Sequence, residues 1–142
     1  MSPHKQEKLF LPEYSFELMR IAHGDLTSAI AIGRSEKPRL ENAFFMLQQA
    51  IEKSLKAVLV KSSIPVPLVH DLGILLAKLP ENLNPPYGYE LSELNQYAAI
   101  RRYEEGSFEI TITDFNKVLS MTEEMLQWSK EQIGKKGKQK GK

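Results

Sequence analysis

The side chains that could bind a charged substrate lie in short, separate stretches of the sequence. His70 and Asp71 are adjacent, and Arg101, Arg102 and Tyr103 form a second group. An imidazole exchanges protons near neutral pH, and a neighbouring carboxylate stabilises its charged form. These five residues are therefore candidates for contact with a nucleotide phosphate or with RNA.

A structural explanation of the same residues remains open. His70 or Asp71 could cap a following helix, because a side-chain acceptor satisfies one of the first N–H groups of that helix. Capping alone contributes about 1 kcal/mol and explains the position. Arg102 could pair with an acid across the fold.

Several kinds of chemistry are excluded by residue counts. The chain contains no cysteine, so it has no disulfide, thiolate metal site or catalytic thiol. Its three histidines show no His-x-x-x-His or Glu-x-x-His pairing, and no glycine-rich phosphate loop precedes a helix. We therefore expect no metal and no cofactor.

The helix predicted over residues 40–62 is the element that must position the candidate groups. The stretch LENAFFMLQQAIEKSLKAVLVKS lacks Gly and Pro and consists mainly of strong helix formers. At 100° per residue its apolar sector covers about half the circumference, so several helices must pack around it. The residues of this sector are Ala43, Met46, Leu47, Ala50, Ile51, Ser54, Leu55, Ala57 and Val58.

The other side of this helix is polar. It carries Gln48, Gln49, Glu52, Lys53 and Lys56. Solvent contact is the default expectation for such a side, with Lys53 and Lys56 as further candidates for ligand or RNA binding. The aromatic ring of Phe45 also projects into it and gains nothing unless it is covered. A second hypothesis is therefore a dimer interface formed by Phe45, Gln48, Gln49 and Glu52.

The remaining pattern predicts an all-α, up-and-down bundle of about five helices, four of them long. We expect the other helices at about 12–34, 71–79 and 89–102, and from Thr111 or Thr113 to Gly134. In the first of them Phe16, Met19 and Ala22 or His23 should face inward, and Gly24 suggests a close approach or a slight bend. An extended connection is expected at 104–113.

Length and charge define the domain organisation. The 142 residues suffice for one domain. We predict a flexible terminus at 1–11, the helical bundle at 12–133 and a disordered tail at 134–142. This tail holds five lysines, without which the net charge of +1 falls to −4. It could attract an acidic partner or simply add solubility. No membrane segment is evident, so we expect a cytoplasmic protein.

The sequence resembles the HEPN domain (higher eukaryotes and prokaryotes nucleotide-binding). The resemblance rests on AFFMLQQAIEKSLKAVLV, on HDLGILLAKL after an extended loop, and on YAAIRRY, and it extends over about residues 14–132. It implies a small helical bundle that is usually a homodimer. It also implies a minimal nucleotidyltransferase as partner, in a toxin–antitoxin pair or as its substrate-binding subunit.

The ribonuclease branch of this family carries Arg, four to six residues, then His. None of the five arginines here is followed by histidine at that spacing. Our first hypothesis is therefore a noncatalytic HEPN protein that dimerises and binds a nucleotidyltransferase, with nucleotide or RNA contact near His70, Arg101, Arg102 and Tyr103. The alternatives are a ribonuclease toxin with an atypical site and a plain protein-interaction domain.

Overall fold

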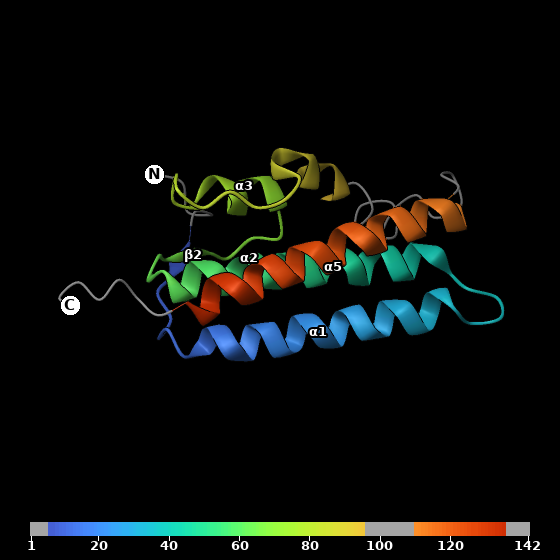
Figure 1. Cartoon of the computed structure of the whole chain (residues 1–142), viewed down its shortest axis with the longest axis horizontal. Coiled ribbons are helices and arrows are strands. Elements are labelled where there is room, and N and C mark those ends of the chain that lie inside the picture. The colour runs from blue at the N-terminus through green and yellow to red at the C-terminus, as the bar shows by residue number, and fades with distance from the viewer. Residues whose placement is uncertain (1–5, 96–109, 136–142) are drawn as a thin grey trace.

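Three long helices form the body of the protein. The structure is a computed structural model, and it describes residues 6–95 and 110–135. Helix α1 is Tyr14–Gly33, α2 is Leu40–Lys61 and α5 is Ile112–Gly134. They lie side by side along the long axis of the molecule, with α1 and α2 joined as an antiparallel hairpin (Figure 1). The predicted all-α bundle is confirmed.

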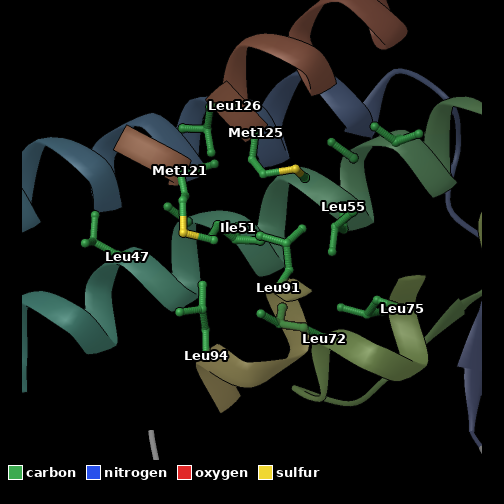
Figure 2. Packing of buried hydrophobic residues seen from close by; sticks show 14 of the residues in the cluster. Leu47, Ile51, Leu55, Leu72, Leu75, Leu91, Leu94, Met121, Met125 and Leu126 are labelled. Atoms are coloured by element: carbon green, nitrogen blue, oxygen red, sulfur yellow. The ribbon is translucent and has the colours of Figure 1, made fainter. Parts of the chain in front are cut away.

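Helix α2 is the centre of the core. Its buried side chains are packed by α1 and α5 on one side and by two short helices on the other. These are α3 (Leu72–Ala77) and the 3₁₀ helix η1 (Gly88–Leu94). Figure 2 shows Leu47, Ile51 and Leu55 of α2 between methionine and leucine side chains of α5 and leucines of α3 and η1. Such a wide apolar sector requires neighbours all round, as the helical pattern predicted.

Helices α1 and α5 approach each other closely where α1 ends and α5 begins. A Cβ atom added to Gly33 would lie 2.5 Å from Cζ of Phe115, so only glycine fits there. The predicted close approach at Gly24 is wrong, because a Cβ at that position would have nothing within 4 Å. The contact between Gly33, at the end of α1, and Phe115, in the first turn of α5, makes the two helices antiparallel neighbours.

Two very short strands connect the N-terminal segment to the loop after α2. Strand β1 (Glu7–Lys8) pairs antiparallel with β2 (Val66–Pro67). Residues 7 and 8 therefore have a defined position, which the polar sequence of this segment did not predict. Two residues per strand carry too little alternation to be recognised.

The inward face of α1 differs from the predicted one. Phe16 is 54% exposed and His23 is also exposed, whereas Ser15, Leu18 and Met19 are buried. The prediction for Phe16 is wrong, because its ring lies in the first turn of α1 on the solvent side, with Nζ of Lys61 5.5 Å from the ring centre. Of the two alternatives Ala22 and His23, Ala22 is the buried one. In the described part of the chain, no helix combines the length and hydrophobicity needed to cross a bilayer.

Only part of the region after α3 can be compared with the prediction. The predicted helix at 89–102 begins as the 3₁₀ helix η1, and its residues from 96 on lie outside the described residues. The predicted extended connection at 104–113 falls mostly outside them too. Helix α5 begins after Thr111 and ends at Gly134, as predicted.

Candidate functional site

A buried carboxylate organises the polar side of α2. Glu52 is 2% exposed although it lies in the sector expected to face solvent. Its Oε2 atom accepts a hydrogen bond from Nζ of Lys56 at 2.9 Å and lies 3.1 Å from Nδ1 of His70. A buried carboxylate needs such partners, because desolvation of an unpaired charge costs several kcal/mol.

The contacts of Glu52 continue as a network toward α1. The amide of Gln49 donates to Oε1 of Glu52 at 3.3 Å and to Oε1 of Gln48 at 3.0 Å. The ammonium group of Lys53 donates to Oε1 of Gln49 and to Oδ2 of Asp25 on α1, both at 3.1 Å. Polar side chains therefore link α1 to α2 along one continuous path.

A second group of contacts fixes the segment that carries His70. Nε2 of the buried Gln48 donates to the His70 carbonyl at 3.2 Å. Asp71 caps α3, with its Oδ1 accepting from the backbone N–H groups of Gly73 at 2.8 Å and Ile74 at 3.4 Å. Capping by Asp71 is therefore confirmed.

Asn95 holds this turn from the opposite direction. Its Nδ2 donates to Oδ1 of Asp71 at 3.1 Å, and its Oδ1 accepts from the backbone N–H of Leu72 at 3.0 Å. The side chain thus bridges the start of α3 and the end of η1. The backbone on both sides of Asp71 is fixed by hydrogen bonds from α2 and from Asn95.

This arrangement leaves the His70 ring available to a ligand. The side chain of His70 is 78% exposed, against 25% for Lys53 and 16% for Lys56. When Nδ1–H donates to Glu52, the second ring nitrogen, Nε2, is free to accept a proton or a hydrogen bond. Both lysines are already in ion pairs, with Asp25 and Glu52. The His70 side chain is therefore more accessible than either lysine.

The predicted site residues fall into two groups. His70, Asp71, Lys53 and Lys56 adjoin the Glu52 network, whereas Arg101, Arg102 and Tyr103 lie outside the described residues. Among the described residues, no group of histidine and acidic side chains could hold a metal ion.

The expectation that the polar side of α2 faces solvent is wrong for two of its residues. Gln48 is 1% exposed and Glu52 is 2% exposed within a single chain, because the segment after β2 covers them. Phe45 and Gln49 are half-buried. An interface formed by these residues stays a prediction, in which Phe45 and Gln49 would offer the accessible surface.

Sequence reasoning missed two residues that position the site. Asp25 lies within a helix and Asn95 within a polar stretch, so neither carries a local signal. Lys53 and Asp25 are 28 positions apart, and Asn95 and Asp71 are 24 apart. Only the packing of the helices brings these pairs together.

Comparison with known proteins agrees with this architecture. A solved structure described as the crystal structure of TT1696 from Thermus thermophilus is similar, with a TM-score of 0.70 and 23% sequence identity. The match covers 84% of this chain and 98% of that one. At this identity the similarity shows the fold alone. No curated protein matches the sequence significantly.

A family comparison is more specific. The sequence model of the HEPN domain matches residues 16–133, from the first turns of α1 to the end of α5. The match includes the helix that carries Glu52 and the turn that carries His70. Because it extends over most of the sequence, the chain belongs to the HEPN domain family.

Proposed function

We propose that this protein is a noncatalytic HEPN subunit that forms a homodimer and binds a minimal nucleotidyltransferase. In this proposal a nucleotide or RNA contacts the protein at His70. The observation that carries the ligand site is the Glu52–His70 contact, which fixes an exposed imidazole on a rigid, buried support. A binding group gains affinity when its position is fixed before the ligand arrives.

The absence of a ribonuclease motif supports a binding role. The sequence lacks the Arg-x4–6-His pattern, so the pair of groups expected for RNA cleavage is missing. Lys53 and Lys56 are largely neutralised by their acidic partners. The cluster is thus better suited to recognise a ligand through hydrogen bonds than to hold several phosphates.

The partner is tested by co-purification and light scattering. The chain is mixed with the product of any minimal nucleotidyltransferase gene next to its own. The expected result is a complex larger than the dimer of this chain alone. Only free dimer, at concentrations well above those in cells, would contradict the nucleotidyltransferase role.

The ligand site is tested by thermal shift with ATP and with a short RNA. His70→Ala should abolish a shift seen with the wild-type protein, because it removes the exposed imidazole. His23→Ala is the matched control, since His23 is also exposed but lies on α1 and makes no hydrogen bond to the Glu52 network within the described residues. Equal shifts for the wild type and His70→Ala would place the ligand elsewhere.

The contact between Glu52 and His70 also favours a second candidate function, a ribonuclease with an atypical site. An imidazole whose Nδ1 contacts a carboxylate and whose Nε2 is free has the arrangement of a general base. Nε2 would remove the proton from a ribose 2′-hydroxyl as that oxygen bonds to the adjacent phosphorus. The bond from phosphorus to the 5′-oxygen breaks, and the 5′-oxygen leaves with a proton from solvent, which yields a 2′,3′-cyclic phosphate. Growth arrest and RNA cleavage abolished by His70→Ala and by Arg102→Ala would favour this candidate. No cleavage at high protein concentration would exclude it.

A further inference from the structure

A cavity of about 390 Å³ lies between the end of α3 and the start of η1. Its lining comes from one short stretch of the chain, residues 76–89. Leu76 at this cavity is buried, and Leu79 and Leu83 pack against the hydrophobic core. Pro80 and Pro85 complete the apolar walls. A volume of about 300–1,000 Å³ is typical of small-molecule sites, so the cavity has the size of a ligand pocket.

The connection between α3 and η1 holds the walls of this cavity in place. Its proline rings, at positions 80, 85 and 86, fix the backbone φ angle. The backbone N–H of Leu83 donates to the Pro80 carbonyl at 3.0 Å, and that of Gly88 donates to the Pro85 carbonyl at 3.4 Å. The connection is therefore folded into turns before any ligand arrives. Binding to such a preformed site costs little conformational freedom.

One aromatic side chain at this cavity remains in contact with solvent. Tyr89, in η1, belongs to the lining and is 63% exposed. An aromatic surface beside apolar walls favours the burial of an apolar ligand, because water is removed from both partners. The face of an aromatic ring also attracts a cation. Tyr89 therefore suits a ligand that is apolar at one end and positively charged at the other.

The charge at the cavity also favours a cation. Glu81 is exposed and is the one charged side chain among the described residues of the lining. Lys78, the lysine closest to it in the sequence, is already in an ion pair with Glu7 at 2.8 Å. Residues 79–95 contain three glutamates and no lysine or arginine. A phosphate or carboxylate group would therefore be repelled here, whereas an ammonium group would be attracted.

We propose that the cavity between α3 and η1 binds a small amphipathic amine, whose apolar body contacts the leucines and Tyr89 and whose ammonium group lies beside Glu81. Because a single short stretch forms the lining, the cavity is compact. A helix of a partner protein would instead need a groove that follows its apolar residues over several turns. This binding site is separate from the ligand site proposed at His70 and does not depend on it.

The test is an NMR titration of the isotope-labelled full chain with phenethylamine. The backbone amides of Leu83, Gly88 and Tyr89 should shift and saturate, with a dissociation constant on the order of 1 mM for so small a probe. Phenethyl alcohol and phenylacetate are the matched probes, because they carry the same ring without the positive charge. Phenylacetate should bind about tenfold more weakly than the amine, since Glu81 repels its carboxylate.

Matched variants test the two side chains separately. Tyr89→Ala should weaken binding of the amine about fivefold, whereas Tyr89→Phe keeps the ring and should bind like the wild type. Glu81→Gln should weaken binding of the amine about threefold and leave that of phenethyl alcohol unchanged. Glu93→Gln is the control, because Glu93 is exposed in η1 but does not line this cavity. It should bind the amine like the wild type.

Three outcomes would overturn the proposal. The first is equal affinity for phenethylamine and phenylacetate, which would show that the cavity does not select by charge. The second is no saturable shift of these amides with phenethylamine at about ten times the expected dissociation constant. The third is a shift of the same amides when the protein alone is concentrated, which would identify a second copy of the chain as the occupant. His70→Ala should bind the amine like the wild type, so failure of the function proposed above would leave these measurements unchanged.

Discussion

Nδ1 of His70 lies 3.1 Å from Oε2 of Glu52, and this contact joins an exposed side chain to a buried one. The His70 side chain is 78% exposed, whereas that of Glu52 is 3% exposed. The imidazole therefore lies at the surface while its orientation is set from inside the fold. Any change to Glu52 should affect both the stability of the bundle and the orientation of the ring.

Glu52→Gln should destabilise the protein by about 1–3 kcal/mol. The amide has nearly the same shape but leaves the ammonium group of Lys56, which is 16% exposed, without its carboxylate partner. The measurement is urea unfolding followed by the fluorescence of Trp128. Glu123→Gln, an exposed change on α5, is the matched control and should stay within about 0.5 kcal/mol of the wild type. Equal losses for the two variants would contradict a structural role of Glu52.

The two glycines of α1 should respond to alanine with opposite sign. Gly24→Ala should stabilise by about 0.5–1 kcal/mol, because the added Cβ has nothing within 4 Å and alanine is the better helix former. Gly33→Ala should destabilise by about 1–3 kcal/mol, because its Cβ would lie 2.5 Å from Phe115 Cζ. The measurement is the thermal unfolding temperature of each variant, compared with that of the wild type. A gain in Gly33→Ala would mean that α1 and α5 are farther apart.

The long helices could be predicted because their apolar residues repeat at helical spacing. The prediction for 40–62 matches α2, Leu40–Lys61, almost to the residue. The pattern was less useful for the inward face of α1, where Phe16 is exposed and small residues are buried. The spacing of apolar residues identifies a helix, but the distance between two packed helices decides which side chains fit between them. The sequence of one helix alone does not determine that distance.

The candidate site could be predicted only in part, because its contacts join residues far apart in the sequence. His70 was identified from its chemistry and Asp71 from its capping position, and both adjoin the polar cluster. Burial of Glu52 was missed, since a helical projection cannot include the segment after β2 that covers it. The hydrogen bond from Gln48 to the His70 carbonyl joins residues 22 positions apart. Neither residue alone predicts it.

Replacing either of two buried serines with alanine should make the protein more stable. The hydroxyl groups of Ser15 and Ser129 are buried and have no hydrogen-bond partner within the described ranges 6–95 and 110–135. Removing an unpaired buried hydroxyl recovers part of its desolvation cost, so each substitution should stabilise by up to about 1 kcal/mol. The measurement is the urea concentration at the midpoint of unfolding, compared between proteins whose unfolding free energy has the same dependence on urea.

Ser54→Ala is the control for this prediction. Ser54 is equally buried, but its hydroxyl donates to the Ile51 carbonyl at 2.9 Å. Its replacement should therefore bring no gain in stability. A gain in Ser54→Ala as large as in Ser129→Ala would attribute the effect to helix propensity rather than to the unpaired hydroxyl.

The first turn of α5 should make stability depend on pH in the acid range. The backbone N–H of Thr111 donates to Oδ2 of Asp114 at 3.0 Å, and the backbone N–H of Asp114 donates to Oγ1 of Thr111 at 3.1 Å. The bond from the Thr111 backbone, assisted by its side chain and by Lys117, lowers the pKa of Asp114 below its ordinary value of 3.8. The charged carboxylate thus stabilises the folded state.

The sign of the pH effect follows from this lowered pKa. In the unfolded chain the carboxyl group of Asp114 has its ordinary pKa of 3.8. The contribution of the charged carboxylate to the stability of the fold is therefore complete above that pH, and it is lost as the pH falls through the lower pKa of the folded state. Asp114→Asn keeps a side-chain acceptor but has no charge. The variant should therefore unfold at a lower urea concentration than the wild type near neutral pH, and this gap should close below pH 3.8. Glu17, whose pKa is also lowered, is present in both proteins and cancels in the difference. A gap that persists unchanged in acid would show that Asp114 acts through its hydrogen bonds and not through its charge.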